Sequence, residues 1–153
     1  MKPATAVRVR RLIEEFALHD LGAPVDLRPV HNVYVPHVSD LEALAGIPAF
    51  AIRPPDLVAT SDRPALIYLD ARLDVPETRL NYAHEVGHVL CGHAGSLPHL
   101  DLGEWWYDRD EREAWQVASR LLIPWSVLVS GYTVSDIAMI CEVPEWLVEM
   151  YPR

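Results

Sequence analysis

Residues 80–93 read LNYAHEVGHVLCGH, and this stretch says more about the fold than any other part of the chain. We expect a helix from Pro76, a residue suited to a first helical turn, to about Leu90, with Gly92 just beyond its end. Its apolar stripe consists of Ala83, Val86, Gly87 and Leu90. Gly87 would let a neighbouring backbone approach closely. The pattern therefore predicts a helix with one packed face and one polar face.

The polar face carries the histidines of an HExxH motif, His84 and His88. On a helix their rings lie about one turn apart, which is the spacing that two imidazoles need to hold one zinc ion. Glu85 lies about 100° further round the helix, so it is poorly placed to bind the same metal but can reach a water molecule beside it. An ordinary amphipathic helix that happens to carry two histidines is the alternative that this pattern leaves open.

A catalytic zinc site usually has three protein ligands, so a third side chain is needed. His93 and His99 follow nearby, but the metzincin pattern requires a histidine ten positions after the first and a glycine between them. His93 comes one position too early, and the required glycine is absent. That pattern is excluded, and His93 is better explained as a loop histidine or an outer-shell histidine.

A carboxylate from a second helix is the other source of a third ligand. We expect this helix to begin near Asp108 or Asp110 and to end at about Leu122. Its core face should consist of Ala114, Val117, Ala118, Leu121 and Leu122. Glu111 and Glu113 project from opposite edges of that face, and the spacing alone does not decide between them.

The remaining patterns predict an α+β fold, with a small antiparallel sheet packed on helices. We expect helices at 6–21 and 39–46, a weak strand at 30–35, three short strands at 49–53, 56–60 and 65–70, a loop at 94–104, a short helix capped by Ser135 and a last helix opened by Pro144. The 153 residues suit a single domain. Within it we expect residues 1–55 to form a helical support region and residues 56–153 to form the catalytic core.

Composition narrows the possible partners and locations. The formal net charge is −9, and the only dense basic run is Arg8, Arg10 and Arg11, so direct nucleic-acid binding is not expected. Residues 133–153 have a helix–turn–helix rhythm but no basic face. The charged start of the chain and the absence of a long apolar run predict a cytoplasmic protein without a membrane span. Cys91 and Cys141 fit that setting as free thiols.

Three segments stand out together: LNYAHEVGHVLCGH at 80–93, EREAWQVASRLLIP at 111–124 and VSDIAMICEVPEWLV at 134–148. Together they resemble the ImmA/IrrE-type metallopeptidases. The resemblance covers roughly residues 60–150, and residues 1–55 match only in general layout. It implies a zincin-like minimal metallopeptidase domain, with zinc held by His84, His88 and Glu111, and with Glu85 as the catalytic glutamate. One position departs from the family pattern: Trp115 stands where the family usually has asparagine.

The resemblance also implies a function. The expected activity is that of a zinc-dependent endopeptidase that hydrolyses a peptide bond in a protein substrate. The expected substrate is a helix-turn-helix transcriptional repressor or a similar regulator, since members of the family commonly cleave or help inactivate such proteins in phage, mobile-element or stress-response circuits. The alternative is a non-catalytic regulatory or binding protein of the phage, mobile-element or toxin–antitoxin type, in which the metal is structural.

Overall fold

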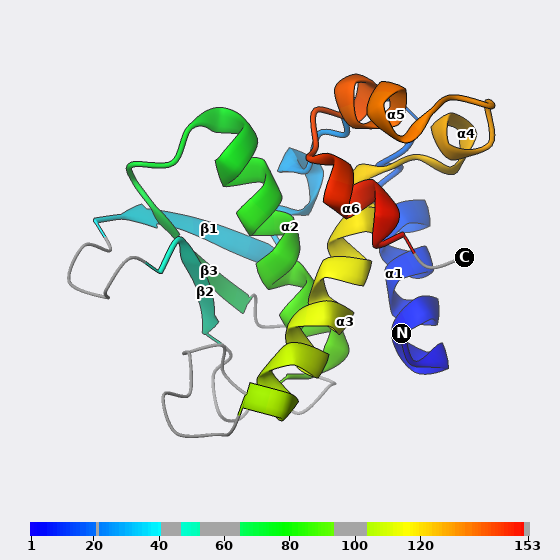
Figure 1. Cartoon of the computed structure of the whole chain (residues 1–153). Coiled ribbons are helices and arrows are strands. Elements are labelled where there is room, and N and C mark those ends of the chain that lie inside the picture. Colours follow the sequence, from blue (N-terminus) through cyan, green and yellow to red (C-terminus); the bar gives the residue numbers. More distant parts are fainter. Residues whose placement is uncertain (21, 41–46, 53–64, 94–103, 152–153) are drawn as a thin grey trace.

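The computed structural model describes residues 1–20, 22–40, 47–52, 65–93 and 104–151, and it confirms the α+β class (Figure 1). The helices are α1 (Pro3–Glu15), α2 (Val75–Cys91), α3 (Glu104–Leu122), α4 (Trp125–Leu128), α5 (Val134–Cys141) and α6 (Glu145–Glu149), and the strands are β1 (Tyr34–Ser39), β2 (Ala49–Ile52) and β3 (Ala65–Asp70). A short 3₁₀ turn at Arg28–Val30 precedes β1. The predicted helix at 41–46 and the predicted strand at 56–60 lie outside the described residues.

The three strands form a mixed sheet in the order β1-β3-β2. The predicted antiparallel pairing is confirmed for β2 and β3, which align Ala49 with Leu69. It does not hold for β1, which runs parallel to β3 and aligns Tyr34 with Ala65 and Ser39 with Asp70. The chain between β1 and β3 is long enough for the crossover that a parallel pair needs, whereas adjacent short strands favour the antiparallel arrangement.

Helix α2 begins and ends at strong local signals. The side chain of Asp74 accepts a hydrogen bond from the backbone N–H of Glu77 at 2.8 Å, and Glu77 accepts one from the backbone N–H of Asp74 at 3.1 Å. This capping box satisfies two N–H groups that a helix start leaves unpaired. At the other end Gly92 adopts a left-handed conformation with φ 75°. The observed helix therefore exceeds the predicted span, Pro76 to Leu90, by one residue at each end.

Helix α2 lies between the sheet and α3, and it contacts β2, β3 and α3 (Figure 1). The backbone of α3 comes close to α2 at Gly87, as predicted: a Cβ added there would lie 2.5 Å from the backbone oxygen of Ala114. The predicted core face of α3 is also confirmed, since Ala114, Val117, Ala118, Leu121 and Leu122 are all buried. Absence of a side chain at position 87 thus sets the distance between the two helices that carry the predicted ligands.

The C-terminal helices are attached to this helix pair. Arg79 in α2 donates hydrogen bonds to the backbone oxygens of Cys141 at 2.6 Å and Glu142 at 2.7 Å, at the end of α5. A cation at this position complements the negative end of the helix. Helix α6 begins after Pro144, as predicted, and contacts both α5 and α3. Helix α5 is capped by Thr133 with Asp136, and not by the predicted Ser135, because a capping box places its acidic partner three positions after the cap.

Three predicted boundaries are wrong. Helix α1 ends at Glu15 and not near residue 21, because Ala17 adopts a positive φ of 49° while Leu18 stays buried and continues the apolar pattern.

Strand β1 occupies 34–39 and not 30–35, so the predicted helix cap Ser39 pairs with β3 instead. Helix α3 starts at Glu104, inside the predicted loop, and the aspartates expected to cap it lie within its first turns. Acidic residues are favourable there, so they mark the start of a helix only approximately.

Two other expectations concern thiols and membranes. Cys91 and Cys141 are both free, as predicted. Among the described residues, the structure contains no helix whose length and apolar character would suffice to cross a bilayer.

Candidate metal centre

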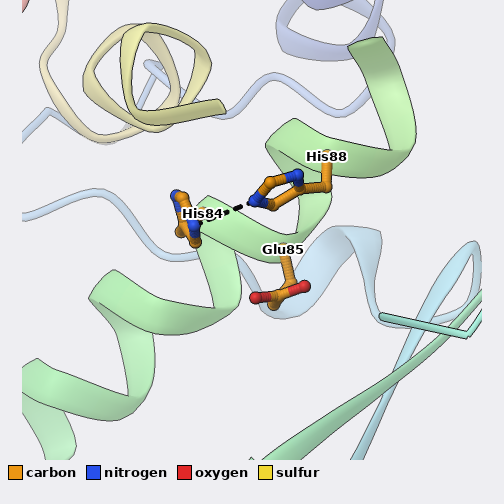
Figure 2. Close-up of side chains that lie close together, drawn as sticks. All are labelled: His84, Glu85 and His88. Carbon is orange, nitrogen blue, oxygen red and sulfur yellow. Dashed lines mark hydrogen bonds between the residues drawn. The ribbon is translucent and has the colours of Figure 1, made fainter. Parts of the chain in front are cut away.

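The imidazoles of His84 and His88 face one another on α2, with their Nε2 atoms 3.0 Å apart (Figure 2). Both residues are buried, at 6% and 5% exposed. Their four-residue spacing places the rings one above the other, and the packing of α2 between the sheet and α3 removes them from solvent. The predicted pair is therefore brought together in a buried position.

Glu111 on α3 reaches the same point from the opposite side. Its Oε2 atom lies 3.0 Å from His84 Nε2, and its Oε1 atom lies 3.2 Å from His88 Nε2. Burial alone would raise the pKa of Glu111, but hydrogen bonds and charge from the two histidines outweigh it and lower the pKa to about 2. Among the described residues no lysine or arginine forms an ion pair with Glu111. We call His84, His88 and Glu111 the inner cluster.

The chemistry and spacing of the inner cluster fit a divalent metal ion. Two imidazole nitrogens and one carboxylate form a common donor set for catalytic zinc. Zn–N and Zn–O bonds near 2.0–2.2 Å in a tetrahedral arrangement place neighbouring donor atoms about 3.3 Å apart. The observed separations of 3.0 to 3.2 Å between donor atoms are close to that value. The three side chains are thus arranged to hold such an ion with little rearrangement.

Glu85 is buried beside the histidine pair, at 4% exposed, and its carboxylate lies to one side of the two rings (Figure 2). One carboxylate oxygen lies within 4.8 Å of donor atoms of both His84 and His88. Glu85 belongs to α2 itself, whereas Glu111 approaches the same imidazoles from α3. Because Glu85 lies about 100° round the helix from His84, its carboxylate is suited to contact a molecule beside an ion held by the inner cluster.

The ring of Trp115 stacks on the imidazole of His84, with ring centroids 3.8 Å apart and planes inclined by 23°. Trp146 in α6 packs edge-on against Trp115 at 4.8 Å. Sequence reasoning identified Trp115 only as a departure from the family pattern and did not predict this contact. The buried Nδ1 atom of His84 has no hydrogen-bond partner among the described residues. Two side chains of α3 therefore restrain this imidazole: Trp115 by stacking on its face and Glu111 by contact with its Nε2 atom.

A second polar group, which we call the outer cluster, consists of Cys91, His93 and Glu113, whose potential donor atoms all lie within 4.8 Å of one another. Glu113, the alternative third ligand, belongs to this group and not to the inner cluster. His93 connects the two, because its Nδ1 atom lies 3.0 Å from His88 Nδ1. His99, the other histidine considered as a ligand, lies outside the described residues.

A family model described as the IrrE N-terminal-like domain, of a peptidase family, matches residues 49–129. The matched segment contains all of the inner cluster together with Glu85. It begins and ends earlier than the segment over which the sequence resemblance was seen. No curated protein and no solved structure matches the chain.

Proposed function

Because the chain belongs to the IrrE N-terminal-like family of peptidases, we propose that it is a zinc-dependent endopeptidase. The observation that carries the proposal is the convergence of His84, His88 and Glu111, from two helices, to within 3.0–3.2 Å, with both histidines buried. Metallopeptidases use this donor set, two histidines and one glutamate, to hold a catalytic ion. Zinc is the proposed ion because imidazole and carboxylate ligands in a tetrahedral arrangement suit it.

A zinc ion held by these residues would supply Lewis acidity toward water and toward a carbonyl oxygen. His84, His88 and Glu111 would hold the ion, and α2 and α3 exclude bulk water from the side on which they pack. Glu85 is the proposed general base, since its carboxylate lies beside the histidine pair and not between the rings. It accepts a proton from the attacking water and transfers that proton to the amine that leaves when the peptide bond breaks.

The proposed substrate is a helix-turn-helix transcriptional repressor or a similar regulator. Support for this part comes from the family resemblance of the three sequence motifs. The net charge of −9 is compatible with a partner that has a basic surface, as DNA-binding regulators have. The proposed setting is the cytoplasm, in which both free thiols would stay reduced.

A second candidate function is a non-catalytic binding protein with a structural metal. The observation that favours it is Trp115, which covers the His84 ring at a position where the family usually has a small amide side chain. In that case the metal would stabilise the α2–α3 pair, and binding of the regulator without cleavage would be the activity.

The test is a comparison of wild type with Glu85→Gln, with Glu149→Gln as the matched control at an exposed glutamate outside the site. Each protein is loaded with zinc and incubated with candidate helix-turn-helix regulators from the same organism, and cleavage is followed by mass spectrometry. We expect Glu85→Gln to keep its zinc content and to lose about 10²–10⁴-fold in cleavage rate, because general acid–base catalysis contributes about that much.

Cleavage by Glu85→Gln at the wild-type rate would exclude Glu85 as the base. Zinc-loaded wild type that binds the regulator tightly without cleaving it would favour the second candidate function. Wild type that takes up no zinc would exclude both.

A further inference from the structure

We propose that His93 is a positioning residue for His88. In this arrangement His93 accepts a hydrogen bond from the Nδ1–H group of His88 and presents its own Nε2–H group to the carboxylates of Asp110 and Glu113. This inference rests on the proposed function, because it assumes that His88 Nε2 binds a metal ion. It assigns a role to a histidine that lies outside the inner cluster.

The end of α2 places His93 over the last turn of its own helix. Gly92, in the left-handed conformation, donates its N–H to the backbone oxygen of Val89 at 3.1 Å, and His93 donates its N–H to that of His88 at 3.1 Å. These two bonds form a Schellman motif, which reverses the chain at a helix end. The reversal brings residue 93 back to residue 88, and the two imidazoles then lie with their Nδ1 atoms 3.0 Å apart.

The position of the inner cluster determines where the protons lie. His88 Nε2 faces Glu111 and His84, so a metal ion bound there would use the lone pair of that nitrogen. A neutral imidazole with a lone pair on Nε2 carries its proton on Nδ1. His88 Nδ1 is then a donor, and the Nδ1 atom of His93 at 3.0 Å must be the acceptor. The proton of a neutral His93 consequently lies on its Nε2 atom.

The surroundings of His93 Nε2 suit a proton at that atom. The side chain of His93 is only 8% exposed, and its Nε2 atom is buried without a hydrogen-bond partner among the described residues. Two carboxylate oxygens lie nearby on α3, Asp110 Oδ1 at 3.4 Å and Glu113 Oε2 at 3.7 Å. Negative charge on that side stabilises an N–H group that points toward it. The result is a series of polar contacts from the carboxylates through His93 to His88. It would orient His88, a proposed metal ligand, through side chains that do not themselves bind the ion.

The other histidine of the inner cluster has no such support. The Nδ1 atom of His84 has no hydrogen-bond partner among the described residues, and its ring is restrained by stacking on Trp115. Of the two histidines, only His88 therefore has its Nδ1 atom oriented by a hydrogen bond within the described part of the chain, and that bond is to His93. Loss of an outer-shell partner of a metal-binding histidine typically weakens metal affinity about 10–100-fold.

The first measurement is zinc affinity, obtained by competition with a chromophoric chelator, for wild type, His93→Ala and His93→Asn. Alanine removes the acceptor, whereas the amide oxygen of asparagine can occupy the place of the Nδ1 atom. We expect His93→Ala to bind zinc about 10–100-fold more weakly and His93→Asn to recover most of that loss. His37→Ala, at an exposed histidine on β1, is the matched control and should bind zinc as wild type does. Thermal unfolding of each metal-free variant reports whether it folds.

The second measurement is the tautomer of His88 in zinc-loaded wild type, read from ¹⁵N chemical shifts of histidine-labelled protein. We expect the proton of His88 on Nδ1 and that of His93 on Nε2. Wild-type zinc affinity in His93→Ala, or a His88 ring with no proton on Nδ1, would overturn the inference while leaving the proposed function intact. Two equivalents of bound zinc, with His93 as a ligand of the second, would also overturn it. A wild-type protein with no affinity for zinc would overturn both this inference and the proposed function.

Discussion

The inner and outer clusters contain similar side chains, lie between the same two helices and are linked through the contact between His88 and His93. In the inner cluster the donor atoms converge to 3.0–3.2 Å. In the outer cluster the distance from His93 Nε2 to Glu113 Oε2 is 3.7 Å, and Asp110, beside the cluster, lies 3.4 Å from the same nitrogen. The carboxylate of Glu113 also has cationic neighbours: Lys2 Nζ lies 3.6 Å and Arg109 Nε lies 3.8 Å from it.

These cations separate the chemistry of the two clusters. Lys2 and Arg109 already balance the charge of Glu113, so a metal ion would have to displace them. Burial, with the charge of Glu113 added, raises the pKa of the Cys91 thiol to about 11, which keeps the sulfur protonated and a poor ligand at neutral pH. The contrast teaches that the two clusters differ in their cationic neighbours: Glu113 has two, whereas no described lysine or arginine forms an ion pair with Glu111.

The largest expected effect comes from exchanging the two glutamates for glutamine one at a time. Glu111→Gln removes a proposed ligand, and we expect zinc affinity to fall on the order of 10³-fold, since the binding energy of such ions is shared among a few ligands. Glu113→Gln alters only the outer cluster and should weaken zinc binding by no more than about 10–100-fold. Competition titration measures both. Equal losses in the two variants would remove the distinction between the clusters.

Acid should affect the stability of the metal-free protein through the inner cluster. Glu111 has a pKa of about 2 in the folded state and about 4.5 in the unfolded state, so its charged form stabilises the fold above pH 4.5. That stabilisation, at most about 3 kcal/mol, is lost as the pH falls from about 4.5 to about 2. Urea unfolding at a series of pH values measures it. The same pH dependence in Glu111→Gln would show that other groups cause it.

Gly87→Ala tests whether both clusters depend on one close helix approach. The added methyl group would meet the backbone oxygen of Ala114 at 2.5 Å, so α2 and α3 must separate, at a cost of about 2 kcal/mol. Zinc affinity should also fall, because separation of the two helices moves Glu111 away from the histidines. Gly131→Ala is the control, because it introduces strain at φ 79° without a clash and should leave zinc binding unchanged. Denaturant unfolding and zinc titration report the two effects, and a Gly87→Ala protein with wild-type values would disprove the spacing argument.

The smallest expected effect concerns Trp115. Stacked aromatic pairs contribute about 0.5–1.5 kcal/mol beyond the area they bury, so Trp115→Asn should weaken zinc binding about 2–10-fold. Trp115→Phe keeps an aromatic face against His84 and should stay close to wild type. Competition titration again provides the measurement. Tighter zinc binding by Trp115→Asn would mean that the tryptophan strains the site and does not support it.

Local signals in the sequence were sufficient to predict the position of the helix that carries the two histidines. Position 92 and the short-range periodicity located α2 to within one residue at each end, and periodicity alone identified the buried face of α3. The choice between Glu111 and Glu113 required the orientation of α3 relative to α2, because the two side chains differ by about 200° around α3. Which of them faces α2 depends on the contact between Gly87 and Ala114, which joins distant parts of the chain.

Long-range pairing also explains what the sequence could not predict about the sheet. The parallel partner of β3 is β1, and no turn signal between them reveals it, since such signals mark only the strands that follow one another closely. The contact between Trp115 and His84 likewise depends on how two helices are packed. The sequence could show that position 115 is unusual, but the consequence appears only in three dimensions.

The hydrogen bonds of Arg79 have a consequence for how this protein can be divided. The family match ends at residue 129, yet Arg79 lies within the matched segment and binds backbone oxygens of residues 141 and 142 beyond it. Trp146 likewise covers Trp115 from outside that boundary. A fragment trimmed to the match would leave a half-buried guanidinium without its acceptors and an aromatic ring uncovered. The shortest piece worth expressing therefore extends through α6.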